Sequence, residues 1–362
     1  MTENPGSSTT LIFPAVNQAA IDYVMASRDR GESVVCAASV YSNEIAAICP
    51  KLHMLPSIHD HDFERRFLSM LEELSISRLF CPVSTAYAYL ARFIQAHRLS
   101  VKMIGQSPVQ QQIEQHHRLV HRAKQLLPHV VCCADGHPAL TLREVAGALR
   151  QTLLIYGESN DDKLAAMMGI FACAPKGDVI EIGSLMGRSA FLMLYLARRY
   201  DIGPLLTVDP WSARECIQRD SPDALQTVTD EWDYEVLSEG FYMNILPLGT
   251  RDHAHLRMPS TGAFEVYENG EAIFSQAGSP VLFSGSISVI HIDGNHDYDS
   301  VNQDCEFWLR KMIPGSWLIL DDYIWAHGDG PYRVGNSLLN EHQNRIRRAF
   351  VCGKALFVNF SH

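Results

Sequence analysis

The sequence lacks several features that would assign it to a common class of protein. Its 362 residues contain no apolar run long enough to cross a bilayer, and the N-terminus has neither the basic nor the apolar part of a signal peptide. Basic residues are in the minority, with 30 Lys and Arg against 41 Asp and Glu, so the formal net charge is −11. This balance disfavours nucleic-acid phosphates and anionic lipid as partners. We therefore expect a cytoplasmic protein whose partner is a small molecule, with no nucleic acid and no membrane involved.

Signatures of zinc sites and disulfide frameworks are also missing. The nine cysteines include no C-x-x-C pair, and most of them stand inside apolar runs, as Cys36, Cys81 and Cys173 do. Cysteines in such positions are usually small buried hydrophobic residues. We expect neither a disulfide framework nor a structural zinc site.

Two stretches of alternating strand and helix patterns are present, and they predict an α/β fold with two Rossmann-like domains. The apolar fraction of 47% is sufficient for two cores of ordinary size. Apolar strands and amphipathic helices alternate over residues 11–104, which predicts a parallel sheet in a smaller domain over residues 1–110. A larger α/β domain is expected over residues 156–362.

The segment between these domains, residues 111–155, is polar and helical and is expected to be a connector. Thr141 and Glu144 form a capping-box pattern that begins a helix within it. At the other end of the chain, two short apolar runs flank Gly353. They predict a hairpin that adds an antiparallel edge to the larger sheet.

A glycine turn lies at the centre of the larger domain, in the segment GDVIEIGSLMGRS at residues 177–189. It has the pattern of a buried strand that includes Glu181, a turn with Gly183 and Gly187, and a helix. Glycine lets the backbone approach a ligand closely, and the first amides of the helix face the turn. The next strand leads to Asp209, 28 residues after Glu181, where an acid often holds the hydroxyls of a ribose. The glycine spacing differs from the G-x-G-x-x-G of dinucleotide-binding proteins, and any doubly wound domain with a glycine turn is the alternative.

The pattern E-x-G-x-x-x-G followed by V-D resembles motifs I and II of the class I S-adenosylmethionine (SAM) methyltransferases. The resemblance implies SAM as the cofactor. The residues expected to bind it are Glu181, Gly183, Ser184, Gly187, Ser189, Asp209, Trp211 and Asp293. Trp211 would pack against the adenine, and ordinary core packing is the alternative for this side chain.

Two further apolar strands end in acidic residues. Residues 287–292 lead to Asp293, and residues 317–320 lead to Asp321 and Asp322. Neighbouring parallel strands would bring these carboxylates to one sheet edge, where they repel each other unless a positive charge lies between them. A hard divalent cation is the simplest such charge. Helix capping or hydrogen bonds to backbone amides is the alternative.

The segments I-D-G-x-H-x-Y and P-G-x-W-x-I-x-D-D-Y are similar to those of the bacterial small-molecule O-methyltransferases of the macrocin and catechol types. The resemblance covers about residues 156–362. It implies Mg²⁺ bound by Asp293, Asp321 and Asp322, although the catechol type has Asp-Asn where this chain has Asp-Asp. It also implies His296 as the base beside the acceptor hydroxyl, with Asp293 as a second catalytic residue. The residues expected near the acceptor are Tyr298, Tyr323 and Arg333, and Arg333 would hold an anionic group or pair with a nearby acid.

The N-terminal domain has a looser resemblance of its own. Residues 55–60, 80–83 and 104–108 resemble segments of the pre-ATP-grasp domain that precedes the nucleotide-binding part of ATP-grasp ligases. No ATP-grasp nucleotide domain follows, so ligase activity is not implied. We expect a scaffold or dimerisation domain, and with it a homodimer.

The sequence thus predicts a SAM-dependent methyltransferase that acts on a hydroxyl of a small-molecule metabolite, with divalent-metal assistance, in specialised metabolism. The alternatives are a metal-independent N-methyltransferase of a small amine and a non-catalytic protein that binds SAM or a nucleotide. Residues 261–285 are rich in Gly, Ser and Glu and have little periodicity. They are expected to form an insertion or lid near the site.

Overall fold

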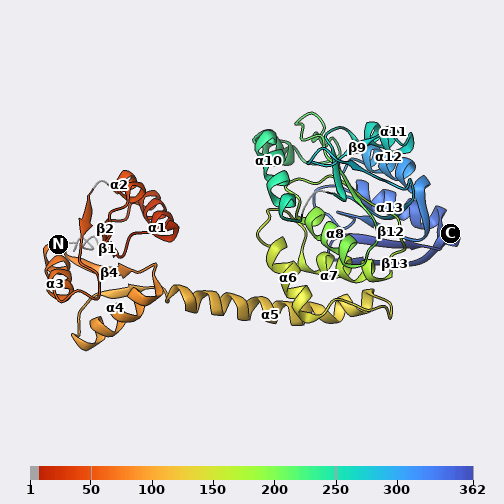
Figure 1. Ribbon diagram of the computed structural model, residues 1–362. Coiled ribbons are helices and arrows are strands. Elements are labelled where there is room, and N and C mark those ends of the chain that lie inside the picture. The colour runs from red at the N-terminus through yellow and green to blue at the C-terminus, as the bar shows by residue number, and fades with distance from the viewer. Residues whose placement is uncertain (1–7, 50, 249–250, 362) are drawn as a thin grey trace. The chain divides into compact units, whose positions relative to one another are not determined.

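The computed structural model describes residues 8–49, 51–248 and 251–361. Residues 1–7, the stretch expected to lack a signal peptide, lie outside the described residues. The chain divides into two compact units, Met1–Arg118 and Leu119–His362 (Figure 1). Within the described ranges, no helix is both long enough and apolar enough to cross a membrane.

The N-terminal unit contains a five-stranded parallel sheet, as the alternation of strands and helices predicts. Its strands have the order β3-β2-β1-β4-β5. Their bounds are β1 Thr9–Ile12, β2 Val34–Ala38, β3 Leu52–Met54, β4 Ile76–Phe80 and β5 Lys102–Ile104, and the helices are α1 Gln18–Asp29, α2 Asn43–Ile48, α3 Phe63–Glu73 and α4 Ser84–Ala96.

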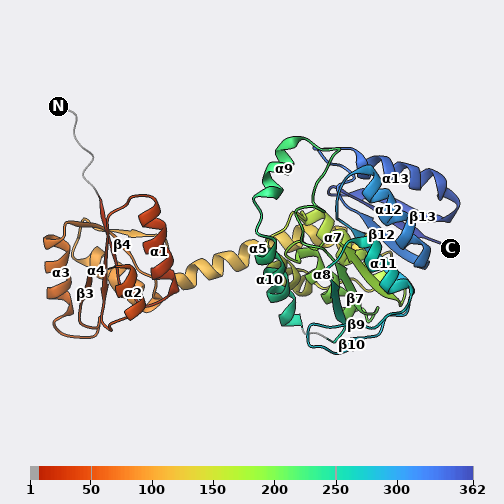
Figure 2. The same ribbon diagram turned by 90° about the horizontal axis from the view of Figure 1, so that it is seen from above.

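Helices cover both faces of this sheet, so successive residues of β1 enter different cores. Leu11 packs with α3 and α4 on one face, whereas Ile12 packs with α1 and α2 on the other. Figure 2 shows α1 and α3 on opposite sides of the strands. This arrangement confirms the predicted Rossmann-like fold class of the unit.

The C-terminal unit is built on a seven-stranded sheet with the order β13-β14-β12-β11-β6-β7-β8. The five strands from β12 to β8 in this order are parallel, and β14 pairs antiparallel with both β12 and β13. The strands are β6 Asp178–Ile182, β7 Leu205–Val208, β8 His253–Leu256, β11 Ile287–Ile292, β12 Met312–Leu320, β13 Ile346–Cys352 and β14 Ala355–Phe360, and a separate small pair consists of β9 Ile273–Phe274 and β10 Pro280–Val281. The predicted antiparallel edge hairpin is confirmed.

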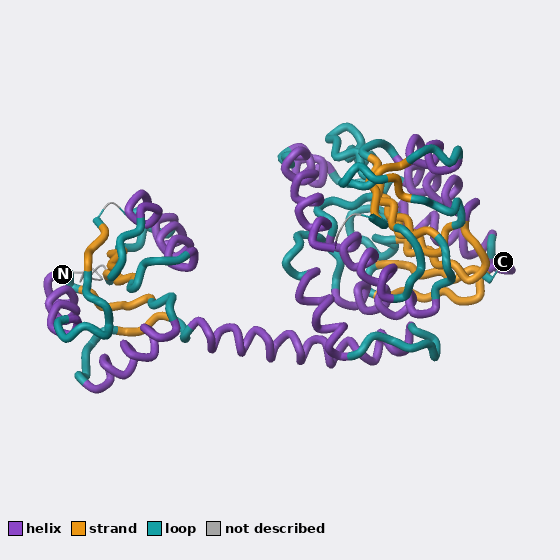
Figure 3. The backbone as a smooth tube through the Cα atoms, in the orientation of Figure 1, coloured by secondary structure: helices purple, strands orange, loops and turns teal. Residues whose placement is uncertain are grey.

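Helices again cover both faces of the larger sheet (Figure 3). Val179 of β6 packs among α5 to α8 and α10, and Ile180 packs on the other face among α11 to α13. The helices are α5 Pro108–Cys133, α6 Leu142–Thr152, α7 Asp161–Ile170, α8 Arg188–Arg199, α9 Asp223–Asp230, α10 Tyr234–Ile245, α11 Ser260–Glu268, α12 Tyr298–Trp308 and α13 Gly330–Glu341, with short 3₁₀ turns η1 Phe171–Cys173, η2 Leu246–Leu248, η3 Leu309–Lys311 and η4 Gln343–Arg345.

The segment expected to be a connector contributes to the larger core. Helix α5 begins within the first unit and continues past Leu119 into the second. Its buried Leu126 and Val130 pack in the same cluster as Val145 and Leu149 of α6. The Thr141–Glu144 capping box is present at the start of α6. Residues 119–155 therefore stabilise the unit that carries the candidate site.

Candidate functional site

The glycine turn after β6 is shaped by the neighbouring strand end. Gly183 has φ of +80°, and a Cβ at this residue would lie 2.0 Å from the carbonyl oxygen of Asp293. Gly187, the N-cap of α8, has φ of +87°, and a Cβ there would meet the ring of Phe241 at 3.0 Å. Both positions therefore require glycine for reasons of backbone conformation and of packing against protein atoms.

Asp209, at the end of β7, holds the turn in place. Its Oδ2 accepts hydrogen bonds from the backbone amides of Ser184 at 2.9 Å and Leu185 at 3.0 Å, and its Oδ1 accepts one from the amide of Trp211 at 2.8 Å. Burial raises the pKa of the Asp209 carboxyl, while these three amides work against that rise. Removing this carboxylate would release two amides of the turn.

A cavity of about 1020 Å³ lies at this edge of the sheet, large enough for a cofactor together with a small acceptor. The predicted residues that line it are Gly183, Ser184, Ser189, Asp209, Asp293, His296 and Asp322. Ser184 Oγ is buried and has no hydrogen-bond partner among the described residues. A buried hydroxyl in the wall of a cavity is a group that a bound ligand can satisfy.

Three residues predicted to bind the cofactor lie away from the cavity lining. Glu181 is fully buried, and its Oε1 lies 3.1 Å from Nδ1 of His291 on the adjacent strand β11. Gly187 packs against Phe241. Trp211 is 3% exposed, donates its indole N–H to the carbonyl of Leu185 and stacks on His255 with ring centroids 4.4 Å apart. The alternative of core packing describes the position of Trp211.

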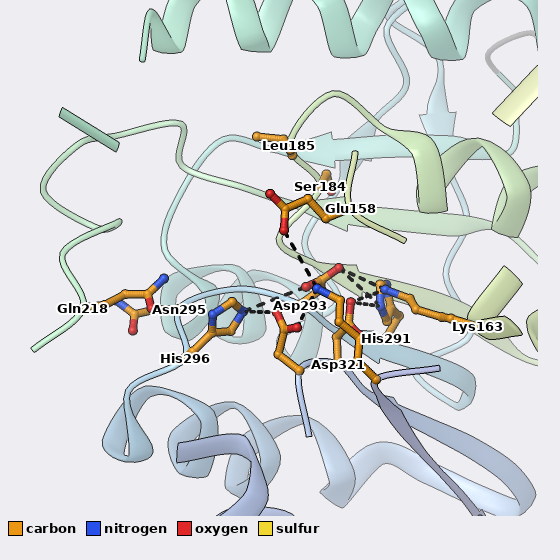
Figure 4. Close-up of polar contacts among 12 residues, drawn as sticks. Glu158, Lys163, Ser184, Leu185, Gln218, His291, Asp293, Asn295, His296 and Asp321 are labelled. Carbon is orange, nitrogen blue, oxygen red and sulfur yellow. Dashed lines mark hydrogen bonds and ion pairs between the residues drawn. The ribbon is translucent and has the colours of Figure 1, made fainter. Parts of the chain in front are cut away.

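The acids at the ends of β11 and β12 converge as predicted, and a lysine lies between two of them (Figure 4). Lys163, in the first turn of α7, has no exposed side-chain surface. Its Nζ lies 3.2 Å from Oδ2 of Asp293 and also pairs with Oδ2 of Asp321. Burial disfavours the Lys163 ammonium, but the two carboxylates outweigh this effect and raise its pKa. Burial would raise the pKa of Asp321, but Lys163 and His291 hold it well below its usual range.

Asp322 belongs to a second set of contacts in the same cavity. It has φ of +51°, and its Oδ1 lies 2.6 Å from Nζ of Lys354. Its Oδ2 lies 3.1 Å from Nε2 of His296. Nζ of Lys354 also lies 4.0 Å from Oε2 of Glu158, which lines the same cavity.

His296 stands in the loop after β11, close to Trp325, with ring centroids 4.5 Å apart. Neither ring nitrogen has a hydrogen bond within the described chain, although Nε2 faces Asp322. Burial lowers the pKa of His296 below its ordinary value of 6.5, and the charge of Asp322 works against this shift. The ring is therefore neutral at neutral pH and can accept a proton there.

The predicted magnesium ligands do not fit one ion bound by three carboxylates. In the described part of the chain, the donor atoms of His291, Asp293 and Asp321 lie within 4.8 Å of one another, and so do those of Asp293, His296 and Asp322. Lys163 already contacts both carboxylates of the first group, and Lys354 contacts Asp322 of the second.

The residues predicted near the acceptor lie outside the cavity lining. The guanidinium of Arg333 stacks on the ring of Tyr298, 4.4 Å from its centroid, and pairs with Asp329 at 3.8 Å. Tyr323 packs beside Tyr332, with ring centroids 5.1 Å apart. Arg333 therefore has the alternative position given for it, in which it pairs with a nearby acid.

A loop that sequence reasoning did not connect to the site forms part of the cavity wall. The side-chain amide of Asn295 donates to the carbonyls of Glu215 at 3.1 Å and Ile217 at 2.7 Å. Asp297 accepts from the amides of Arg219 and Asp220, at 2.8 and 2.9 Å. These contacts hold residues 215–220 against the loop that carries His296, and Figure 4 shows Gln218 beside Asn295.

One comparison with known proteins agrees with this geometry. Residues 180–323, from within β6 to just beyond β12, match a family model described as a methyltransferase domain. No curated protein matches the chain. The C-terminal unit therefore contains a methyltransferase domain, and the protein is a methyltransferase.

Several solved structures are similar to the chain at low identity. The O-methyltransferase NovP is 15% identical, with 66% of this chain and 98% of NovP covered and a TM-score of 0.41. CalS11, a TDP-rhamnose 3′-O-methyltransferase of calicheamicin biosynthesis, is 13% identical, with 72% and 97% covered and a TM-score of 0.37. An O-methyltransferase from Bacillus cereus, solved with SAH, is 13% identical, with 67% and 91% covered and a TM-score of 0.32. These likenesses are too distant to bear on the acceptor.

Gly183→Ala is expected to destabilise the C-terminal unit by about 1–3 kcal/mol and to abolish cofactor binding. The added Cβ would overlap the carbonyl of Asp293, so the turn and the end of β11 would have to separate. Thermal unfolding and calorimetry with S-adenosylhomocysteine (SAH) measure the two effects. The matched control is Gly147→Ala in α6, where a Cβ meets nothing within 4 Å. Equal stability and SAH affinity in Gly183→Ala and the control would contradict this account of the turn.

Proposed function

We propose that this protein transfers the methyl group of SAM to a hydroxyl group of a small-molecule metabolite, in specialised metabolism. The observation that carries the proposal is the His296–Asp322 pair, 3.1 Å apart, in the wall of the same cavity as the glycine turn and Asp209. The glycine turn and a neutral histidine thus line one cavity, and in this proposal they serve as the cofactor cradle and the base. Methyl transfer to a hydroxyl needs both.

The charge of the cavity supports a cationic cofactor. Among the described residues that line it, nine are Asp or Glu and four are Lys or Arg. SAM carries a sulfonium and an ammonium group against one carboxylate, so an acidic cavity favours it. Asp209, which holds the turn through Ser184 and Leu185, would also accept hydrogen bonds from the ribose hydroxyls.

The proposed reaction is an in-line displacement in which positioning supplies most of the rate. The acceptor oxygen forms a bond to the methyl carbon while the carbon–sulfur bond breaks. The electron pair of the broken bond stays on sulfur, which gives SAH. The proton of the hydroxyl goes to His296. Because Nε2 faces Asp322, Nδ1 is the nitrogen that can take this proton, and the carboxylate stabilises the imidazolium that forms.

The homodimer stays a prediction, whereas the magnesium assistance expected from the sequence forms no part of the proposed reaction. The reaction above has no step that requires a metal, and the two lysines already neutralise part of the carboxylate cluster. The pre-ATP-grasp resemblance of the N-terminal unit is likewise a prediction. Light scattering of the purified chain tests the dimer.

A small amine is the second candidate acceptor. The excess of carboxylates around the cavity favours an uncharged or cationic acceptor over an anionic one. A protonated amine would lose its proton to the same base before transfer.

Incubation of the enzyme with methyl-labelled SAM and metabolite extracts tests the proposed function. A labelled product that mass-spectrometric fragmentation identifies as a methyl ether supports the hydroxyl acceptor, whereas an N-methyl product supports the amine. The His296→Ala variant serves as the control for background methylation. Binding of SAM without any labelled product from any extract would support the non-catalytic alternative.

The fragment 119–362 is expected to fold alone and to bind SAH with an affinity within about twofold of that of the full chain. The described residues that line the cavity all lie between Tyr156 and Lys354, within the second unit. Calorimetry on both proteins checks this expectation. A fragment that unfolds cooperatively but does not bind SAH would mean that the N-terminal unit contributes to the cofactor site.

A further inference from the structure

Lys163 is the one lysine of helix α7, and both its backbone amide and its side-chain ammonium are held by contacts. The helix N-cap, Asn160, accepts a hydrogen bond from the backbone amide of Lys163 at 2.9 Å. The side chain then runs through the core, where its surface is fully buried, to Asp293 and Asp321. A buried ammonium is tolerated only where carboxylates pair with it.

The ammonium occupies the position where a shared cation between these two carboxylates would lie. Asp293 and Asp321 follow the adjacent parallel strands β11 and β12, and Nζ of Lys163 contacts an oxygen of each. His291 of β11 adds a third contact, because its Nε2 lies 3.6 Å from Asp293 and 3.8 Å from Asp321. A divalent ion between the same carboxylates would meet the ammonium at close range, and like charges repel strongly in a buried site.

The third predicted ligand faces a different partner. Asp322 pairs with Lys354 and His296 and does not contact Lys163 in any ion pair of the described residues. Lys163 thus pairs with Asp293 and Asp321, and Lys354 pairs with Asp322.

We propose that Lys163 serves as a built-in cation that takes the place of a divalent metal at the Asp293–Asp321 pair, so that this methyltransferase domain needs no metal. Lys163 is a positioning residue in this proposal, because it acts on the cavity through Asp293. It holds the two strand ends together and leaves Asp322 to orient His296. The proposal goes beyond the proposed function, since it concerns the cation and holds whichever acceptor is used.

Titration of the EDTA-treated full-length protein with Mn²⁺ alone, followed by electron paramagnetic resonance, tests this proposal. The wild-type protein is expected to show no saturable Mn²⁺ binding up to about 1 mM, the weak end of the range for protein cation sites. Lys163→Met removes the ammonium and leaves two facing carboxylates beside His291. This variant is expected to gain one Mn²⁺ site per chain, and Mn²⁺ should raise its Tm but not that of the wild type.

Lys176→Met is the matched control, because Lys176 is 66% exposed and pairs with Asp201 away from the cavity. It is expected to behave like the wild type in both measurements. If Lys163→Met does not fold, Lys163→Gln, which keeps a hydrogen-bond donor, is titrated in its place. A folded Lys163 variant that gains no Mn²⁺ site overturns the proposal.

Saturable binding of one Mn²⁺ by the wild type also overturns it, and loss of that binding in His296→Ala would assign the ion to Asp293, His296 and Asp322. SAH calorimetry on the same wild-type samples, with and without EDTA, separates this question from the proposed function. Equal SAH affinity in both is expected. Absence of SAH binding would contradict the proposed function while leaving the Mn²⁺ result readable.

Discussion

Asp321→Ala is expected to lower the free energy of unfolding of the C-terminal unit by about 3–5 kcal/mol, the range for breaking a buried ion pair by removing one partner. Asp321 is 2% exposed, and Lys163 has no exposed side-chain surface. Without Asp321, the ammonium keeps only the partly exposed Asp293 as a carboxylate partner among the described residues. All five tryptophans lie in this unit, so urea unfolding followed by tryptophan fluorescence reports on it alone.

Two further variants give this prediction its controls. The double variant Lys163→Met with Asp321→Ala removes both charges and is expected to recover much of the lost stability, because no unpaired ammonium remains. Asp329→Ala removes an exposed carboxylate that pairs with Arg333 at 3.8 Å, and its cost is expected to be at most about 1 kcal/mol. If Asp321→Ala lowers the free energy of unfolding no more than Asp329→Ala does, Lys163 does not form the buried ion pair with Asp321.

His296→Ala is expected to lower kcat/KM by roughly 10²–10⁴-fold, the usual contribution of a positioned base. SAH affinity should change little, since the glycine turn and Asp209 remain intact. His137→Ala, at an exposed position before α6, is the control and should leave both values unchanged. Steady-state kinetics with the acceptor found by labelled-SAM profiling gives the measurement. Full activity of His296→Ala would mean that the proton leaves by another route.

The dependence of the wild-type kcat/KM on pH is expected to show the ionisation of His296. Burial lowers the pKa of His296 below 6.5, so kcat/KM should rise with pH through a limb below 6.5 and be level near neutrality. His296→Ala should lose this limb. A limb above pH 7 in the wild type would point to a different base.

The sequence was most informative where short segments alone determine the structure. A buried strand, a glycine turn and the start of a helix follow one another within thirteen residues, and the parallel sheet itself places the acid after the next strand. Gly183 and Asp209 accordingly lie at the cavity. The reason for Gly183 differs from the one expected, because its missing Cβ makes room for Asp293 and not only for a ligand.

Partners that come from distant segments were not predictable in the same way. Lys163 lies 130 residues from Asp293 and 158 from Asp321, and nothing in the local pattern of α7 shows that its ammonium is buried. The sequence offered one indirect signal, because the seven residues that follow Lys163 have no polar side chain, and all seven are buried. A lysine at the start of such a run has to reach water or a carboxylate.

The sequence also did not predict the direction in which side chains on helices and loops point. Tyr298 is the first residue of α12, and Arg333 lies near the start of α13. Their side chains contact each other and do not line the cavity. Residues 261–285 were expected to be an insertion or lid, yet Phe264 and Tyr267 of α11 are buried in the core. Their spacing of three residues was too short a signal among the surrounding glycines and serines.

Calorimetric titration of the intact chain with SAH measures whether the cavity at the glycine turn holds the cofactor of the methyltransferase domain. One SAH site per chain is expected, with binding weakened by about 1–3 kcal/mol in Asp209→Ala, because charge-assisted hydrogen bonds to the turn and to the ribose are lost. No heat of binding in the wild type, or equal affinity in Asp209→Ala, would contradict the assignment of this cavity as the cofactor site of a methyltransferase.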